Sequence, residues 1–274
     1  IRVVIDFPIA AVDTYHKWFQ TGASTFSDYF LWIKNKTMIE ENRTVDCEKG
    51  RCFKSTPDDH GAVLNWHYEP LRRALLEEVI FWVDHNVDGV HLTSVEHLIR
   101  RKHYKTGDLE KISGYLKEFI FQLKHRAQDR ELFVCTSLDR SSTKNLTVDE
   151  FEDKLKPESS GFDAILRDTL FFIDQECRSF CLRGILEKSI GTRIGSHRLY
   201  TLGGPDVEHL ADRLGEEMAQ MFNLLFLSLP GSVIIYYGDE IGLLDHSRIL
   251  FVMMVSQSSV TMPDFSLWRQ YFYT

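Results

Sequence analysis

The sequence predicts an α/β protein built on parallel strands, and three observations support this prediction. Short apolar runs rich in β-branched residues alternate with single amphipathic helical patterns along most of the chain. No glycine-rich nucleotide-binding loop follows an early strand, and no P-loop is present. The length of 274 residues is close to the roughly 250 residues of an eight-stranded parallel barrel. A doubly wound open sheet is the alternative.

The expected elements follow one another in a regular order. Strands are predicted at residues 2–7, 90–92, 131–136, 162–167, 197–202 and 233–237. Helices are predicted from residue 70, at 109–126, through Cys177 and Cys181, at 208–227 and at 265–273. Because single helices separate successive strands, the strands are expected to be parallel and joined by right-handed crossovers.

The helix that begins at residue 70 has the clearest signal. Pro70 suits a first helical turn. The apolar residues of one helix face then recur at i, i+4, i+8 and i+11, and they are Leu71, Leu75, Val79 and Trp82. Residues 22–63 just before it are polar and irregular, and we interpret them as an insert.

Composition excludes several classes of function. Hydrophobic residues make up 43% of the chain, which is enough for a globular core. The formal net charge is −8, and no basic block interleaved with aromatics occurs, so a nucleic-acid partner is not expected. No apolar run reaches the roughly 18 residues of a membrane span, and no signal peptide is visible.

Sequons and cysteines indicate an oxidising, extracellular setting. Asn35, Asn42 and Asn145 begin N-x-Ser/Thr sequons and are candidate glycosylation sites. Cys47 and Cys52 lie close together in a polar loop, which fits a small-loop disulfide, with two free surface thiols as the alternative.

The other three cysteines are read differently. Cys177 and Cys181 are spaced four apart on a helical pattern, and we interpret them as two buried thiols. Cys135 stands in an apolar strand and is expected in the core.

In a parallel barrel, functional side chains lie at the C-terminal ends of the strands. Those ends present, in chain order, Asp6, Thr93, Thr136, Asp206 and Asp239. Strand alternation places His91 on the same side as Thr93, so a His–Thr pair is an open alternative for nucleophilic chemistry.

Five segments have the form of known signatures, and one of them, ELFVCTSL, is similar to the strand that carries the general acid. NVDGVHLTSVEHL is similar to GFRIDAVxHL, and VVIDFPIAAVDTYHKWF is similar to DxVPNHTSDxHxWF. YTLGGPD is similar to a signature that carries an aspartate, and LPGSVIIYYGDEIGL is similar to the specific run LPGTPxIYYGDEIGM. On these segments the chain resembles the α-amylase clan of glycoside hydrolases. The resemblance implies a (β/α)8 TIM barrel that here lacks strands one and two, as a fragment would.

The resemblance also places the clan's catalytic positions. Thr93 falls at the nucleophile, His91 at the arginine beside it, and Thr136 at the general acid, while Asp6 and Asp206 match aspartates. Retaining enzymes of this kind need two carboxyl groups about 5 Å apart, and both positions carry hydroxyls instead. We therefore expect no enzyme activity, with these five as vestigial positions.

No cofactor or metal is expected. Some enzymes of the clan bind calcium near the asparagine of the DxVPNH signature, where this chain has Ala10. An alanine side chain offers no ligand to a metal ion.

One branch of the clan, the heavy-chain subunits of heteromeric amino-acid transporters, shares further segments. They are WFQ at 18–20, SDYFLW at 27–32, LNW at 64–66 and GGPD at 203–206. The resemblance implies an inactive ectodomain on the extracellular side of the plasma membrane, in a type II single-pass glycoprotein. It further implies a membrane helix before Ile1, and a cysteine there that is disulfide-linked to a transporter light chain.

The expected organisation has barrel strand three in residues 1–21, the insert in 22–63, and the remaining barrel in 64–274. Two other functions stay open. One is an α-glucosidase or amylase-type glycoside hydrolase with an atypical site. The other is a non-enzymatic extracellular binding module without a transporter.

Overall fold

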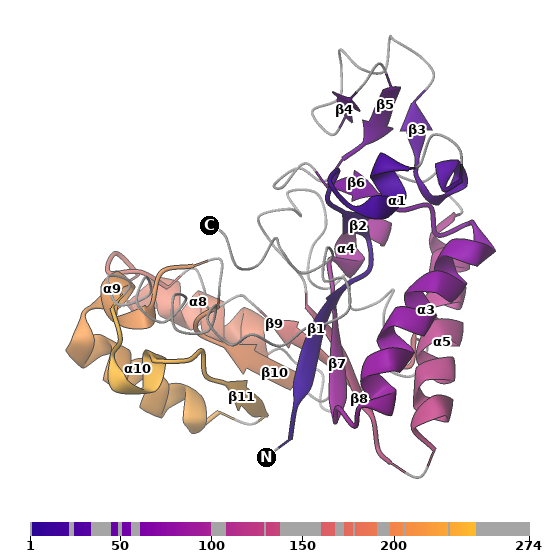
Figure 1. Ribbon diagram of the computed structural model, residues 1–274. Coiled ribbons are helices and arrows are strands. Elements are labelled where there is room, and N and C mark those ends of the chain that lie inside the picture. Colours follow the sequence, from indigo (N-terminus) through magenta and orange to yellow (C-terminus); the bar gives the residue numbers. More distant parts are fainter. Residues whose placement is uncertain are drawn as a thin grey trace, which may run out of the picture. The chain divides into compact units, whose positions relative to one another are not determined.

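The structure is a computed structural model, drawn in Figure 1. It describes residues 2–21, 25–33, 45–48, 51–55, 61–99, 108–128, 130–137, 160–167, 173–177, 179–190, 198–204, 207–229 and 231–244. The chain divides into two compact units, the first ending at Asp163 and the second beginning at Ala164. The helix expected at 265–273 lies outside the described residues.

Three parallel strands form the main sheet of the first unit. They are β1 (Val4–Pro8), β7 (Gly89–Thr93) and β8 (Phe133–Ser137), and β7 pairs with both of the others. Val90 and Leu92 of β7 are fully buried, whereas His91 and Thr93 between and after them are half-buried. The parallel pairing predicted from the alternation of strands and helices is confirmed.

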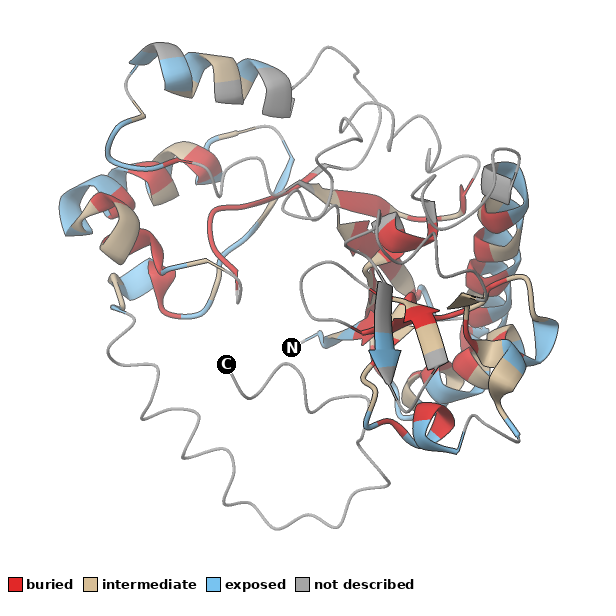
Figure 2. Cartoon of the chain, turned by 90° about the horizontal axis from the view of Figure 1, so that it is seen from above, coloured by how far each residue is buried: buried red, intermediate tan, exposed pale blue. Residues whose placement is uncertain are grey.

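Two long helices connect these strands. Helix α3 (Glu69–Asp84) precedes β7, and α5 (Asp108–Ala127) precedes β8, as Figure 1 shows. On the predicted apolar face of α3, Leu71, Leu75 and Val79 are fully buried, whereas Trp82 is half-buried. The Ile112, Leu116 and Leu123 face of α5 is buried. Figure 2 colours the described residues by their burial. Within the described ranges, no helix combines the length and apolarity that crossing a bilayer requires.

Short elements fill the region between β1 and α3. Strands β2 (Ala11–Val12) and β6 (Ala62–Val63) form one antiparallel pair, and α1 (Lys17–Gln20) and η1 (Ser27–Tyr29) are single turns. A three-stranded antiparallel sheet follows the order β3 (Trp32–Ile33), β5 (Arg51–Lys54) and β4 (Val45–Glu48). The ring of Phe19 stacks or packs edge-on against the rings of Phe30, Trp32 and Phe53, which anchors this sheet on α1.

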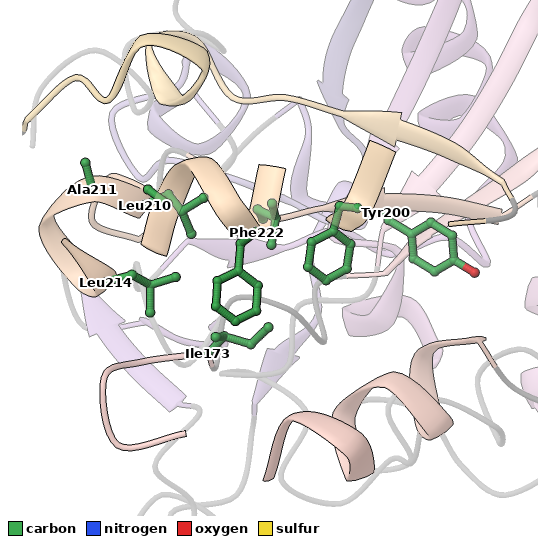
Figure 3. Close-up of a cluster of buried hydrophobic side chains, with 9 residues drawn as sticks. Ile173, Tyr200, Leu210, Ala211, Leu214 and Phe222 are labelled. Carbon is green, nitrogen blue, oxygen red and sulfur yellow. The ribbon is translucent and has the colours of Figure 1, made fainter. Parts of the chain in front are cut away.

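The second unit repeats the parallel plan. Its strands β9 (Ala164–Arg167), β10 (Arg198–Thr201) and β11 (Ser232–Ile234) pair in parallel, with β10 in the middle. Its helices are α8 (Ser179–Ile190), α9 (Leu210–Leu214) and α10 (Glu216–Leu227), with a 3₁₀ turn η3 (Asp239–Ile241) after β11. Ile173, Tyr200, Leu210, Phe222 and their neighbours form its buried core (Figure 3).

The single helix expected at 208–227 is wrong. Gly215 divides it into α9 and α10, because its backbone angles of φ 82° and ψ 155° lie far from helical values. Glycine adopts a positive φ without the steric cost that a side chain would bring. Glu216 and Glu217 then stand in the first turn of α10, where acidic side chains favour a new helix start.

The expectation of two buried thiols at Cys177 and Cys181 is also wrong, because the structure joins them in a disulfide. Helix α8 begins only at Ser179, so Cys177 lies in the turn before it. That turn is fixed by the carboxylate of Asp174, which accepts hydrogen bonds from the backbone N–H groups of Glu176 and Cys177 at 2.9 and 3.0 Å. Cys181 is exposed, which a buried thiol would not be.

The remaining cysteines are accounted for as well. Cys47 and Cys52 are joined in a disulfide between opposite residues of β4 and β5. Cys135 is a buried free thiol in β8. Burial, reinforced by the negative charges of Asp6 and Asp163, raises the pKa of the Cys135 thiol to about 12.

This arrangement predicts the thiol count of the unreduced protein. At pH 8 the native protein should show no equivalent reactive toward a thiol reagent, because Cys135 is buried and stays protonated well below its pKa of about 12. Unfolding in guanidinium should release one equivalent, and Cys135→Ala should remove it. A native equivalent, or three equivalents after unfolding, would contradict the assignment of the two disulfides.

Candidate functional site

The C-terminal ends of β1, β7 and β8 lie at one edge of the first unit's sheet, because the three strands are parallel and adjacent. In parallel α/β barrels this edge carries the functional side chains. The side chains of Asp6, His91 and Thr93 stand there, and Asp6 and His91 are direct partners in the strand register.

Asp6 and His91 form a hydrogen-bonded pair. One carboxylate oxygen of Asp6 accepts a hydrogen bond from Nδ1 of His91 at 2.7 Å. The Asp6 side chain is 59% exposed and that of His91 only 15%, so solvent screens the pair and its contribution to stability is small. The hydrogen bond instead orients the imidazole ring of His91. A neutral imidazole that donates from Nδ1 keeps Nε2 as a hydrogen-bond acceptor. Nε2 is buried and has no hydrogen-bond partner among the residues that the structure describes.

Thr93 follows His91 by two positions and therefore faces the same side of β7. Its hydroxyl oxygen is also buried, and the described part of the chain offers it no hydrogen-bond partner. Ser94, with φ of 63°, turns the chain directly from β7 into helix α4 (Val95–Ile99). Val95 and Leu98 of that helix are fully buried, which fixes the end of the strand.

Thr136 does not stand beside Thr93, and that part of the expectation needs correction. Thr136 is the register partner of Leu92, so it lies on the opposite face of the sheet from His91 and Thr93. It is fully buried, and its hydroxyl donates to the carbonyl oxygen of Leu92 at 2.8 Å. The residues of β8 that share the face of His91 and Thr93 are Cys135, which is the register partner of His91 and is buried, and Ser137, which is half-buried. The alternation of side chains along a strand is the sequence signal that could have identified Ser137.

Several other predicted positions lie outside the described residues. They are Asp206 and the sequon residues Asn35, Asn42 and Asn145. Ala10 is described and is completely buried. Across the described ranges, no group of three or more His, Cys, Asp or Glu side chains is placed to hold a metal ion.

The second unit contains a buried polar pair in which Asp239, predicted at a strand end, is joined by His209, which no sequence motif indicated. Nδ1 of His209 donates to a carboxylate oxygen of Asp239 at 2.9 Å, and the backbone N–H of Leu210 donates to the same oxygen at 3.0 Å. Asp239 follows β11, and it thereby ties η3 to the start of α9. A Cβ at Gly203 would overlap the second carboxylate oxygen of Asp239, so the space around the pair is closed. This pair is structural.

Arg213 also holds the start of α9 in place. Its guanidinium donates to the carbonyl oxygens of Glu208, Ile173 and Leu202. Burial lowers the pKa of Arg213, and the negative charges of Asp239 and Glu208 act in the opposite direction. The segment before α8, the end of β10 and the start of α9 are thus held by one side chain.

Comparison with known proteins gives relatives in two functional groups. A trehalose synthase of Pimelobacter sp. is 26% identical over 298 residues, covering 90% of this chain and 52% of that protein. The human amino acid transporter heavy chain SLC3A1 is 23% identical over 288 residues, covering 89% of this chain and 41% of that protein. The chain spans about half the length of these relatives. No family model matches the chain.

Solved structures give the same fold. The trehalulose synthase MutB of Pseudomonas mesoacidophila has a TM-score of 0.71 at 16% identity, over 89% of this chain and 50% of that one. An α-amylase from H. orenii has a TM-score of 0.66 at 19% identity, over 89% and 51%. The predicted α-amylase type of fold is therefore confirmed. The chain is a homologue of α-amylase-family (glycoside hydrolase family 13) proteins, with the parallel α/β fold of part of their (β/α)8 barrel.

Proposed function

We propose that this chain is a catalytically inactive, amylase-like part of the ectodomain of an amino-acid-transporter heavy chain. One observation supports the proposed loss of activity. Among all residues of β1, β7 and β8, Asp6 is the only carboxylate, and it is bonded to His91. The other polar side chains on its face in these strands are His91, Thr93, Cys135 and Ser137, and none of them is a carboxylic acid.

Retaining glycosidases need a carboxylate nucleophile and a carboxylic acid about 5 Å apart. The hydroxyl of Thr93 is neutral at physiological pH and would need a base to act as a nucleophile. His91 offers Nε2 on the same face, but Ser137 cannot supply the strong acid that the leaving group needs. Loss of a nucleophile alone can lower turnover by about a million-fold.

The heavy-chain part of the proposal rests on the similarity to SLC3A1 and on the sequence segments shared with that branch. The Cys47–Cys52 disulfide fits an oxidising compartment. We place the chain on the extracellular side of the plasma membrane, with residues 22–63 as an insert and glycans on Asn35, Asn42 and Asn145. The membrane helix and the cysteine that bonds the light chain would precede Ile1.

A second candidate function is favoured by a specific observation. The trehalose synthase similarity, at 26% identity, supports a glycoside hydrolase or a related glucosyl-transferring enzyme. In that case His91 and Thr93 would have to replace the missing carboxylates. A plain extracellular binding module is the third possibility, and the two experiments below separate all three.

The heavy-chain role predicts a covalent complex in the native membrane. A non-reducing gel of the protein from surface membranes should show one large species. Reductant should convert it to a smaller glycosylated band, and glycan removal should shift that band further. Mass spectrometry of the released partner should find a multi-span transporter. A single monomeric band with and without reductant would contradict the covalent heavy-chain role.

The loss of catalytic groups predicts no glycoside hydrolysis. The native protein and its Thr93→Ala variant should both release glucose from a maltoside at the rate of buffer alone, with an active α-glucosidase as the positive control. This follows from the roughly million-fold cost of losing a nucleophile. Turnover that is present in the native protein and abolished by Thr93→Ala would establish the atypical enzyme instead.

A further inference from the structure

The disulfide between Cys177 and Cys181 is not part of the candidate site at the ends of β1, β7 and β8. It lies in the second unit and joins the turn before α8 to the first turn of that helix. A bridge with a sequence separation of four closes a very short loop, and short loops gain little from restricting the unfolded chain. Its position therefore calls for an explanation other than global stability.

The two sulfur atoms differ in their surroundings. Cys181 is exposed on α8. Cys177 is half-buried and packs against the core of the second unit, the cluster that contains Ile173, Tyr200 and Phe222 (Figure 3). A thiolate that approaches from solvent therefore reaches the sulfur of Cys181 first.

The described side chains of helix α8 make few other contacts with its unit. None of its side chains that the structure describes is fully buried, and its apolar contacts with the core come from half-buried Leu182 and Leu186. Arg183, which is exposed, is paired within the helix to Glu187 at 2.7 Å. Elements with few buried contacts open locally at low free-energy cost.

The turn before α8 is held independently of the disulfide. Ile173 is fully buried, and its carbonyl oxygen accepts a hydrogen bond from Arg213 at 3.0 Å. Asp174 fixes the two backbone N–H groups that follow. Opening the disulfide would therefore release the start of α8 and leave the turn in place.

The Cys47–Cys52 disulfide provides an internal comparison. Cys47 is also exposed, and the sequence separation is five, so accessibility and loop length are similar in the two bridges. Cys47 and Cys52, however, are opposite residues in the β4–β5 pair of a three-stranded sheet. The strand pairing keeps these two sulfurs together even when the bond is broken, which favours its closure.

We propose that Cys177–Cys181 is a thiol–disulfide exchange site, at which a small thiol of the glutathione class forms a mixed disulfide with Cys181. The thiolate attacks the sulfur of Cys181, and a new S–S bond forms as the Cys177–Cys181 bond breaks. The electron pair leaves on the sulfur of Cys177, which then takes a proton. A second thiol can attack the mixed disulfide, so that both cysteines are reduced and the thiol is oxidised to its own disulfide.

The exchange is coupled to the state of α8. With the bridge closed, the start of the helix is fastened to the turn that carries Ile173. With the bridge open or capped, the contacts that the described side chains of the helix keep with the core are those of Leu182 and Leu186. The inference does not rest on the proposed transporter role.

Graded reduction of the native protein tests the exchange site. The protein is equilibrated with reduced glutathione over a concentration series, quenched with acid, alkylated, and mapped by mass spectrometry. Cys177–Cys181 should open at about tenfold lower glutathione than Cys47–Cys52. The glutathione adduct should sit on Cys181. Equal or greater resistance of Cys177–Cys181, or an adduct found on Cys177, would overturn the proposal.

Limited trypsin digestion tests the coupling to α8. Cleavage after Arg183 should be slow in the untreated protein and about tenfold faster after glutathione treatment. The Cys177→Ser/Cys181→Ser variant should be cut fast in both conditions, whereas Cys47→Ser/Cys52→Ser should behave as the parent protein does. Equal cleavage of the parent protein before and after reduction would refute the release of α8.

Discussion

The parallel register of β1, β7 and β8 is the constraint on which the candidate site depends. It pairs Asp6 with His91 and Leu92 with Thr136, and strand alternation then decides which side chains share a face. Close contact of β7 and β8 is possible because residue 89 is glycine. A Cβ there would lie 2.6 Å from the carbonyl oxygen of Phe133.

This register determines what chemistry the strand ends can offer. The face that carries Thr93 contains one carboxylate, and the imidazole of His91 occupies it at 2.7 Å. The pair is largely exposed on the Asp6 side, so it orients a ring more than it stabilises the fold. By contrast, His209 and Asp239 are both buried, and losing one partner of such a pair typically costs about 3–5 kcal/mol.

Much of the fold could be predicted from the sequence, because long elements carry strong periodic signals. The buried face of α3 and the strands around Val90 follow from apolar spacing alone. The break at Gly215 was missed, because a glycine inside a helical pattern is usually tolerated at modest cost. Whether a single glycine such as Gly215 ends a helix depends on its backbone angles, which the sequence pattern does not give.

The site was predicted less completely, for a related physical reason. Motif spacing located the end of β8 but assigned the position to Thr136, which lies one residue before Ser137. A shift of one residue reverses the face of the sheet. The Cys177–Cys181 bridge was missed because the helix was expected to include Cys177, whereas it begins at Ser179. In both cases the error was one or two residues in an element boundary, which is where pattern-based prediction is weakest.

The central claim is that Ser137, and not Thr136, shares the site's face with Thr93. The most direct measurement is the native thiol reactivity of Thr136→Cys and Ser137→Cys, each in a Cys135→Ala background. The account predicts that the cysteine at 137 reacts in the folded protein, while the one at 136 reacts only after unfolding. Native reaction at 136 together with protection at 137 would contradict the register and the site derived from it.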